Sequence, residues 1–173
     1  MDEQKYPLRV GRGMIAIAFV GALLVMTLVF DQLQDRQRNP NMHPVGEVRG
    51  QVREVILESN RRNSYIATAA VNGRDVEVLI DTGATQVAVS ESLAKRLGLR
   101  RGPSFEVATA NGVTTAYATL LDSVRLGNIE LHGVKASVVP RMSEPDVLLG
   151  MNFLSKLEMT QSNGQLILRQ YPD

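Results

Sequence analysis

Hydrophobic residues follow three different patterns along the chain. An uninterrupted apolar run occupies residues 13–30, a polar segment follows to Pro44, and from Tyr65 onward short apolar stretches alternate with Gly- and Asn-containing turns. A run of 18 uncharged residues is typical of a membrane-spanning helix, because at 1.5 Å per residue it spans about 27 Å. The short, punctuated stretches are typical of β-strands. The pattern predicts one transmembrane helix followed by an all-β domain.

The apolar run has a second interpretation as a cleavable signal peptide. Its end, Leu28-Val29-Phe30-Asp31, offers no small-x-small cleavage site, so an uncleaved signal anchor is favoured. Basic residues stay on the cytoplasmic side of a membrane, and more of them precede the run than follow it. They are Lys5, Arg9 and Arg12 before it and Arg36 and Arg38 after it. We therefore expect a single-pass inner (cell) membrane protein with a cytoplasmic N-terminus and a periplasmic or extracytoplasmic domain.

Four segments are expected from these patterns. Residues 1–12 form the cytoplasmic tail, 13–30 the anchor, 31–54 a polar linker and 55–173 the folded domain. The linker prediction rests on two prolines and the lack of any apolar period between Asp31 and Pro44.

Turn residues divide the folded domain into hairpins. Asn72-Gly73 is the strongest hairpin signal, because both central residues of a type I′ turn need positive φ. Asn111-Gly112, Gly127-Asn128 and Asn163-Gly164 mark further turns. The predicted strand pairs are 65–71 with 76–80, 105–109 with 113–119, 121–126 with 129–139, and 159–161 with 165–168.

Two short helices are predicted among the strands. Ser90 caps a helix over 91–97 that stops at Gly98, and a second helix over 152–157 follows Gly150. We interpret the apolar residues of both helices as core.

Composition excludes several kinds of function. The net charge of +1 gives no electrostatic reason to expect nucleic acid. The chain has no cysteine, which excludes disulfides, thiolate metal sites and cysteine nucleophiles. His43 and His132 lie far apart without ligand spacing, so a histidine metal site is not expected. The Gly-x-Ser-x-Gly, His-Glu-x-x-His and phosphate-loop motifs are absent from the sequence, and no metal or cofactor is implied.

One carboxylate stands out at the end of the apolar strand 76–80. Asp81 is followed directly by Thr82, Gly83 and Ala84, a pattern typical of an aspartic protease active site. Such hydrolysis needs two aspartates that share one proton, one activating a water and the other polarising the carbonyl. The sequence contains only one Asp-Thr-Gly, so the simplest complete site is a homodimer with Asp81 of each chain at a two-fold axis. An ordinary strand-to-turn junction capped by the aspartate is the alternative interpretation.

The chain resembles the retropepsin-like aspartic proteases, which are single-domain dimeric relatives of the pepsins, and within them a membrane-anchored bacterial branch. The resemblance covers about residues 55–170, and its motifs occur in the order of that branch. They are Asn72-Gly73, Ile80 to Thr85, Arg96 to Leu99 and Leu148 to Leu154. It implies a closed β-barrel domain with one or two short helices, and peptide or protein substrates.

The resemblance also assigns roles by position. Asp81 would be the catalytic aspartate, Thr82 would hydrogen-bond across the dimer axis, and Gly83 and Ala84 would complete the active-site loop. A hairpin would form a flap that closes over substrate and excludes water; its residues are Ala108, Thr109, Ala110, Asn111, Gly112 and Val113. A support strand would cross behind the site; its residues are Leu148, Leu149 and Gly150.

These inferences predict a membrane-anchored, homodimeric aspartic endopeptidase without a cofactor. Met151 stands where viral enzymes often have Arg, although Met-Asn suits the bacterial branch. The pepsin-type flap tyrosine is missing, because Tyr117 lies beyond the turn. The alternative is a catalytically silent retropepsin-fold module that binds peptides or scaffolds a complex at the membrane, because a fold does not guarantee activity.

Overall fold

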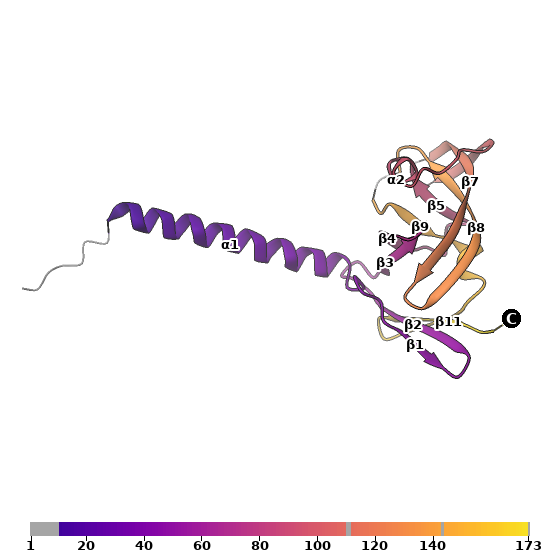
Figure 1. Cartoon of the computed structure of the whole chain (residues 1–173), viewed down its shortest axis with the longest axis horizontal. Helices are drawn as coiled ribbons and strands as arrows, with labels where there is room; N and C mark the ends of the chain where they lie inside the picture. Colours follow the sequence, from indigo (N-terminus) through magenta and orange to yellow (C-terminus); the bar gives the residue numbers. More distant parts are fainter. Residues whose placement is uncertain (1–10, 110–111, 143, 173) are drawn as a thin grey trace, which may run out of the picture. The chain divides into compact units, whose positions relative to one another are not determined.

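The computed structural model describes residues 11–109, 112–142 and 144–172. The chain divides into two compact units, Met1–Asp35 and Arg36–Asp173, and each is described by itself. The first unit contains most of α1 (Arg12–Arg38), the long indigo helix of Figure 1. By its length and composition, α1 is a helix that could cross a membrane. Its large apolar side chains are exposed to the surroundings.

The helix continues beyond the apolar run into the segment predicted to be a linker. It ends at Arg38 rather than at Phe30. The residues in between include several good helix formers, and the first proline of this region comes only at Pro40.

The second unit, which we call the body, is built from eleven described strands and two short helices in two sheets (Figure 1). The strands are β1 (Gly46–Arg49), β2 (Val52–Glu58), β3 (Ile66–Val71), β4 (Arg74–Ile80), β5 (Val87–Ser90), β6 (Ser104–Thr109), β7 (Gly112–Leu126), β8 (Ile129–Val139), β9 (Val147–Leu149), β10 (Glu158–Ser162) and β11 (Gln165–Gln170). The helices are α2 (Glu91–Arg96) and α3 (Met151–Leu154). The prediction of a mostly β domain with short helices is confirmed.

The larger sheet has seven strands in the order β3-β4-β9-β5-β8-β7-β6. The pairs β4–β9 and β5–β8 are parallel, and the others are antiparallel. β7 also returns to β3 through the pairs Ala70–Arg125 and Val71–Val124. The closed barrel that was predicted is not clearly present, because the larger sheet returns to β3 only through these two residue pairs.

The four predicted hairpin pairings are present, with two differences. The predicted strands 113–119 and 121–126 are a single strand, β7, because no turn residue interrupts them and Leu120 pairs with Lys135. β1 and β5 were not predicted. β5 is a four-residue run that is buried throughout, and so short an apolar run has no alternation that identifies a strand.

Both predicted helices are present but shorter. α2 begins after Ser90, whose side chain accepts a hydrogen bond from the backbone N–H of Leu93. α3 starts one residue earlier than predicted and ends at Leu154. Phe153, Leu154 and Leu93 are almost completely buried, so the interpretation of their apolar faces as core is confirmed.

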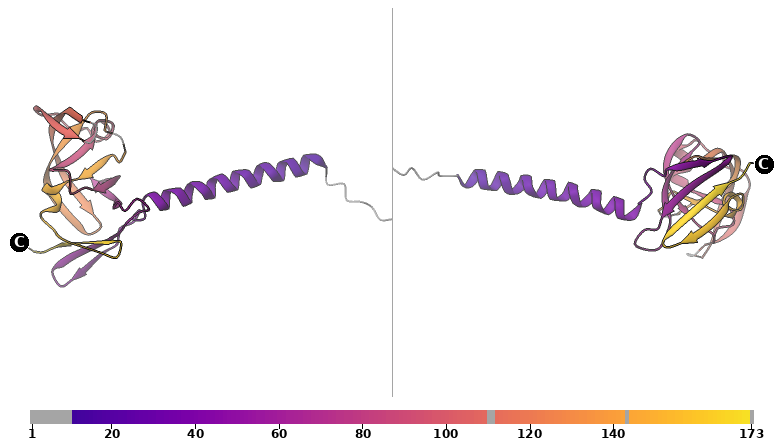
Figure 2. Two further views of the ribbon diagram at one scale, coloured as in Figure 1. Left: turned by 180° about the vertical axis from the view of Figure 1, so that it is seen from behind. Right: turned by 90° about the horizontal axis from the view of Figure 1, so that it is seen from below.

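The smaller sheet has the order β1-β2-β11-β10 and is antiparallel throughout. β2 pairs with β11 along its length, and Figure 2 shows these strands side by side in the view from below. Val55 and Leu57 of β2 and Leu166 and Leu168 of β11 face the main core. This sheet therefore joins the first and last long strands of the body.

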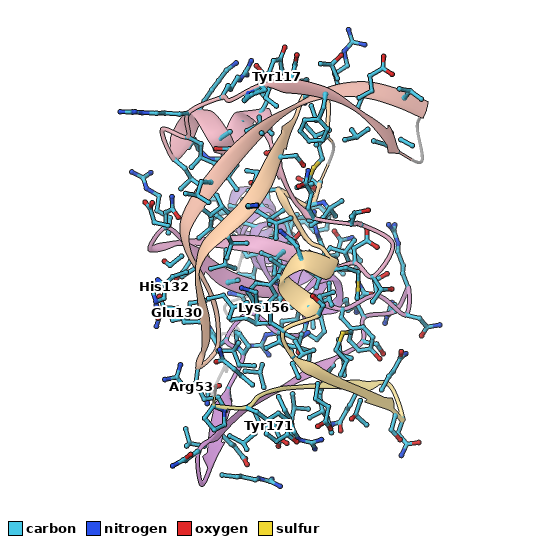
Figure 3. The ribbon with its side chains drawn as sticks, turned by 90° about the vertical axis from the view of Figure 1, so that its right-hand side faces the viewer. Arg53, Tyr117, Glu130, His132, Lys156 and Tyr171 are labelled. Carbon is cyan, nitrogen blue, oxygen red and sulfur yellow. The ribbon has the colours of Figure 1, made fainter. Side chains whose placement is uncertain are left out.

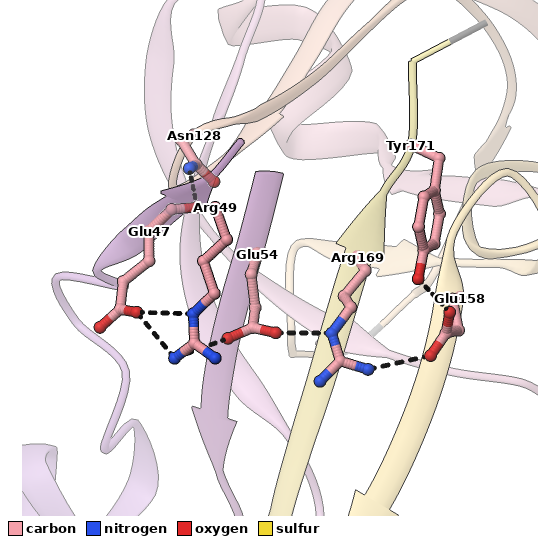
Figure 4. A network of polar contacts seen from close by, with 7 residues as sticks. All are labelled: Glu47, Arg49, Glu54, Asn128, Glu158, Arg169 and Tyr171. Atoms are coloured by element: carbon pink, nitrogen blue, oxygen red, sulfur yellow. Dashed lines mark hydrogen bonds and ion pairs between the residues drawn. The ribbon is translucent and has the colours of Figure 1, made fainter. Parts of the chain in front are cut away.

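A row of charged side chains crosses the outer face of the smaller sheet (Figure 4). Glu54 on β2 is almost completely buried, and its carboxylate accepts a 2.5 Å hydrogen bond from Arg169 on β11. Arg169 also contacts Glu158 on β10 at 2.9 Å. Hydrogen bonds from the Tyr171 hydroxyl and from Arg169 lower the pKa of Glu158. Because a buried carboxylate is costly when unpaired, the row favours one register of β2 against β11.

Candidate active site

Asp81 is positioned by the end of β4. Its backbone N–H donates to the carbonyl oxygen of Leu149 at 3.1 Å, which extends the β4–β9 pairing by one step. Its side-chain oxygen Oδ1 accepts a hydrogen bond of 2.8 Å from the backbone N–H of Gly83. The side chain is half-buried, and Thr82 and Gly83 are exposed. The carboxylate is thus held by the backbone at the surface of the body, where another molecule can reach it.

The loop after Asp81 lies across Gly150. The backbone N–H of Met151 donates to the carbonyl oxygen of Ala84 at 2.8 Å. A Cβ atom placed on Gly150 would lie 2.5 Å from the carbonyl oxygen of Gln86 and 2.7 Å from that of Ala84. Gly150 is therefore required for the close approach of two backbone segments, which gives a physical reason for the Leu-Leu-Gly motif.

Asn152 joins the same loop to two other strands, and sequence reasoning did not identify it as part of the site. Its side-chain oxygen accepts a 2.9 Å hydrogen bond from the backbone N–H of Val87, and its amide nitrogen donates to the carbonyl oxygen of Lys135 at 2.6 Å. Its backbone N–H donates to the carbonyl oxygen of Thr85 at 3.1 Å. The available signal was an asparagine at the start of α3, directly after Gly150-Met151.

The predicted support strand lies next to the predicted catalytic loop. β9 runs between β4 and β5, where Leu149 pairs with Ile80 and Leu148 pairs with Ala88. Leu149 is fully buried, whereas Leu148 is half-buried. The structure therefore brings Leu148, Leu149 and Gly150 together with Asp81, from motifs that are far apart in the sequence.

The predicted flap is the hairpin of β6 and β7. Ala108 pairs with Val113, and Thr109 pairs with Gly112. The Thr109 hydroxyl donates to the carbonyl oxygen of Gly112 at 2.7 Å. Val113 is 70% exposed. Ala110 and Asn111, which were also assigned to the flap, lie outside the described residues.

A small apolar cluster, separate from the main core, connects the base of this hairpin to the support strand. It contains the buried Ala88, Ala116 and Val139 with the partly buried Phe105, Val107, Met142 and Leu148. Phe105 and Val107 belong to β6, and Leu148 belongs to β9. A movement of the hairpin would therefore change the packing directly against the strand that supports Asp81.

Two residues that were not expected to belong to the site lie elsewhere. Tyr117 is on β7, where the Arg101 guanidinium lies 5.0 Å from the centre of its ring. His132 is exposed on β8, on the same side of the strand as Glu130 (Figure 3). Among the described residues, no group of three or more His, Cys, Asp or Glu side chains is arranged to hold a metal ion.

Comparison with known proteins identifies the family. Residues 67–156, more than half of the chain, match the family described as "gag-polyprotein putative aspartyl protease". The chain belongs to this aspartyl protease family. The body is also similar to the crystal structure of a retropepsin-like aspartic protease from Rickettsia conorii, with a TM-score of 0.58 and 29% identity, over 69% of this chain and 92% of that one. The retropepsin-like fold predicted from the motifs is confirmed.

Two further relatives are uncharacterized proteins. One, from a Sinorhizobium species, is 35% identical over 62% of this chain and 48% of its own length. The other, from Rickettsia prowazekii, is 27% identical over 70% of this chain and 53% of its own length. The chain thus spans about half the length of these two relatives. The family and the fold together support a protease-type function.

Proposed function

We propose that this protein is a membrane-anchored aspartic endopeptidase that is active as a homodimer, with Asp81 of each chain forming a shared catalytic dyad. The observation that carries the proposal is the half-buried Asp81 at the end of β4: its carboxylate accepts a hydrogen bond from the backbone N–H of Gly83, and its own backbone N–H donates to the carbonyl oxygen of Leu149. One carboxylate cannot be proton acceptor and proton donor at the same moment. The sequence has no second Asp-Thr-Gly, so the missing group is supplied by a second copy.

The reaction follows from two aspartates that share one proton. The ionised Asp81 removes a proton from a water molecule, and the protonated Asp81 donates a hydrogen bond to the substrate carbonyl oxygen. The water oxygen attacks the carbonyl carbon while the protonated Asp81 transfers its proton to the carbonyl oxygen, and a tetrahedral gem-diol forms. The Asp81 that took the proton from water then gives it to the nitrogen, and the other Asp81 takes a proton back from one gem-diol hydroxyl. The C–N bond breaks, a carboxylic acid and an amine are released, and the pair again shares one proton. Gly83 N–H holds the Asp81 carboxylate in place, and the exposed Thr82 would direct its hydroxyl across the dimer axis.

The anchor supports this arrangement. A helix such as α1 confines the chains to one plane, which raises their effective concentration and favours dimerisation. More basic residues precede the apolar run than follow it, so the body lies on the side of the membrane opposite the cytoplasm. In a bacterium this side is the periplasm.

The first test compares wild type with Asp81→Asn, using full-length protein in lipid nanodiscs and a diverse peptide library read by mass spectrometry. Asp122→Asn, at an exposed aspartate on β7, is the matched control. We expect cleavage by wild type and by the control, and a loss of at least about a thousandfold in Asp81→Asn. Cleavage that persists in Asp81→Asn contradicts the proposal. A folded, dimeric wild type that cuts nothing favours the silent binding module.

The shared dyad has its own test. Wild type and Asp81→Asn are mixed in known proportions before reconstitution, so that subunits pair at random. If two Asp81 residues are needed in each site, activity falls as the square of the wild-type fraction. A linear decrease would show that each chain acts alone.

A further inference from the structure

The residues that directly follow the membrane helix are fastened to the body. Asn41 is almost completely buried, and its amide nitrogen donates to the carbonyl oxygens of Glu58 at 2.9 Å and Ile66 at 2.7 Å. Its side-chain oxygen accepts a 2.7 Å bond from the backbone N–H of Glu58. Its carbonyl oxygen accepts a bond from the backbone N–H of Thr68. A side chain that bonds three partly buried backbone groups holds its segment against the body.

Arg38 makes a second connection, to β4 and to the segment before β9, the two strands that position Asp81. Its guanidinium contacts Glu77 on β4 at 2.8 Å and Glu144, shortly before β9, at 2.5 Å. β4 carries Asp81, and β9 carries the Leu149 carbonyl that receives its backbone N–H. Arg38 thus bridges the middle of β4 and the segment before β9, the two parallel strands whose C-terminal ends form the site.

Strand β4 sets the distance between Glu77, which pairs with Arg38, and the catalytic carboxylate of Asp81. Glu77 precedes Asp81 by four residues, which corresponds to about 13 Å along a β-strand. β4 lies inside the larger sheet, between β3 and β9. This distance therefore does not depend on loop conformation.

The free tether between membrane and body is short. Arg38 follows Phe30, the end of the apolar run, by eight residues. Eight residues span about 12 Å as a helix and at most about 28 Å when fully extended. Adding the Arg38–Glu77 pair and the β4 segment, Asp81 stays within roughly 50 Å of the end of the apolar run, whatever the orientation of the two units.

The diameter of the body exceeds the length of this tether. A unit the size of Arg36–Asp173 has a diameter of about 35–40 Å. The active site therefore works in a thin layer next to the bilayer, where proteins of the same membrane are concentrated.

From this geometry, and resting on the proposed function, we propose that the substrates are membrane proteins cut in segments just outside the bilayer. A susceptible segment held farther out lies beyond the reach of Asp81. Free peptides remain chemically cleavable, because they diffuse to the site.

The test uses full-length protein in liposomes and single-span reporter proteins. Each reporter carries the peptide sequence that the wild type cuts best in the library, either about 5 residues from its span or on a rigid helical-repeat spacer about 90 Å from it. A long-tether variant carries about 20 Gly/Ser residues between Asp35 and Arg36, which adds roughly 25 Å of r.m.s. length. The matched control carries the same residues after Asp173, where they do not lengthen the tether.

We expect wild type and the matched control to cut the near reporter at least about tenfold faster than the far one. The long-tether variant is expected to cut the far reporter several-fold faster than wild type does. All three proteins should cut the free peptide at the same rate. Equal cleavage of both reporters by wild type overturns the proposal about substrates but agrees with the proposed protease activity. Failure to cut any free peptide overturns the proposed function as well.

Discussion

Asp81 and Leu149 are joined by a backbone hydrogen bond of 3.1 Å between the N–H of the first and the carbonyl oxygen of the second. The bond lies just beyond the parallel pair Ile80–Leu149. The candidate catalytic residue is therefore placed by the pairing of two strands, and its loop rests on the glycine that follows Leu149. Substitutions beneath the loop that follows Asp81 are expected to alter the site without contacting the Asp81 carboxylate.

Gly150→Ala is expected to destabilise the body by about 3 kcal/mol, because the new methyl group would lie within 2.7 Å of two carbonyl oxygens. Tyrosine fluorescence during urea unfolding measures the loss. Gly133→Ala is the matched control: its φ is +61° but nothing lies within 4 Å of the added Cβ, so only about 1 kcal/mol of backbone strain is expected. Equal losses in the two variants would contradict the steric explanation.

Asn152→Ala is expected to cost about 1–3 kcal/mol, because the buried backbone N–H of Val87 and the Lys135 carbonyl oxygen lose their partner. Hydrogen exchange should show faster exchange at Val87 than in wild type. Gln161→Ala, at an exposed position on β10, serves as the control. Unchanged protection of Val87 would mean that another group replaces the amide.

Asp146→Asn tests a charge near the start of β9. Partial burial raises the pKa of Asp146, but hydrogen bonds from the Ser90 hydroxyl and the Arg96 guanidinium outweigh it, so the folded pKa lies below its ordinary value of 3.8. A lowered folded pKa stabilises the fold above the unfolded pKa, and this contribution is lost as pH falls through the folded pKa.

We therefore expect wild type to exceed Asp146→Asn in stability at pH 6, and the difference to be smaller at pH 3. Its size is no more than about 1 kcal/mol, because the side chain is one-third exposed and screened by solvent. Urea unfolding at both pH values measures it, with Asp122→Asn as the control. A difference that grows in acid would have the wrong sign for this explanation.

The segment before β1, which contains Asn41, is expected to stabilise a soluble fragment of the body. A fragment beginning at Arg36 should unfold at a higher temperature than one beginning at Val45, because the shorter one loses the Asn41 bonds to Glu58, Ile66 and Thr68. The expected difference is about 1–3 kcal/mol. Asn41→Ala in the longer fragment should reproduce most of it. Equal melting temperatures for the two fragments would show that the segment is dispensable.

Local signals made much of the fold predictable. Asn72-Gly73 and Asn163-Gly164 predict hairpins because positive φ is a property of the residues themselves, and both asparagines have positive φ in the structure. Asn41 and Asn152 could not be assigned in this way, since their partners are backbone groups of distant strands. The segment around Asn41 lacks apolar periodicity, which is why the region 31–44 resembles a linker although Asn39 and Asn41 are buried.

The pairing of β2 with β11 has a consequence for the order in which the body folds as it is synthesised. Residues 52–58 leave the ribosome early, but their partner strand, residues 165–170, emerges more than a hundred positions later. Contacts between such distant segments form late in folding. Until β11 arrives, Glu54 lacks Arg169, and the smaller sheet is incomplete. We expect the smaller sheet, and with it the body, to complete its folding only after β11 has left the ribosome.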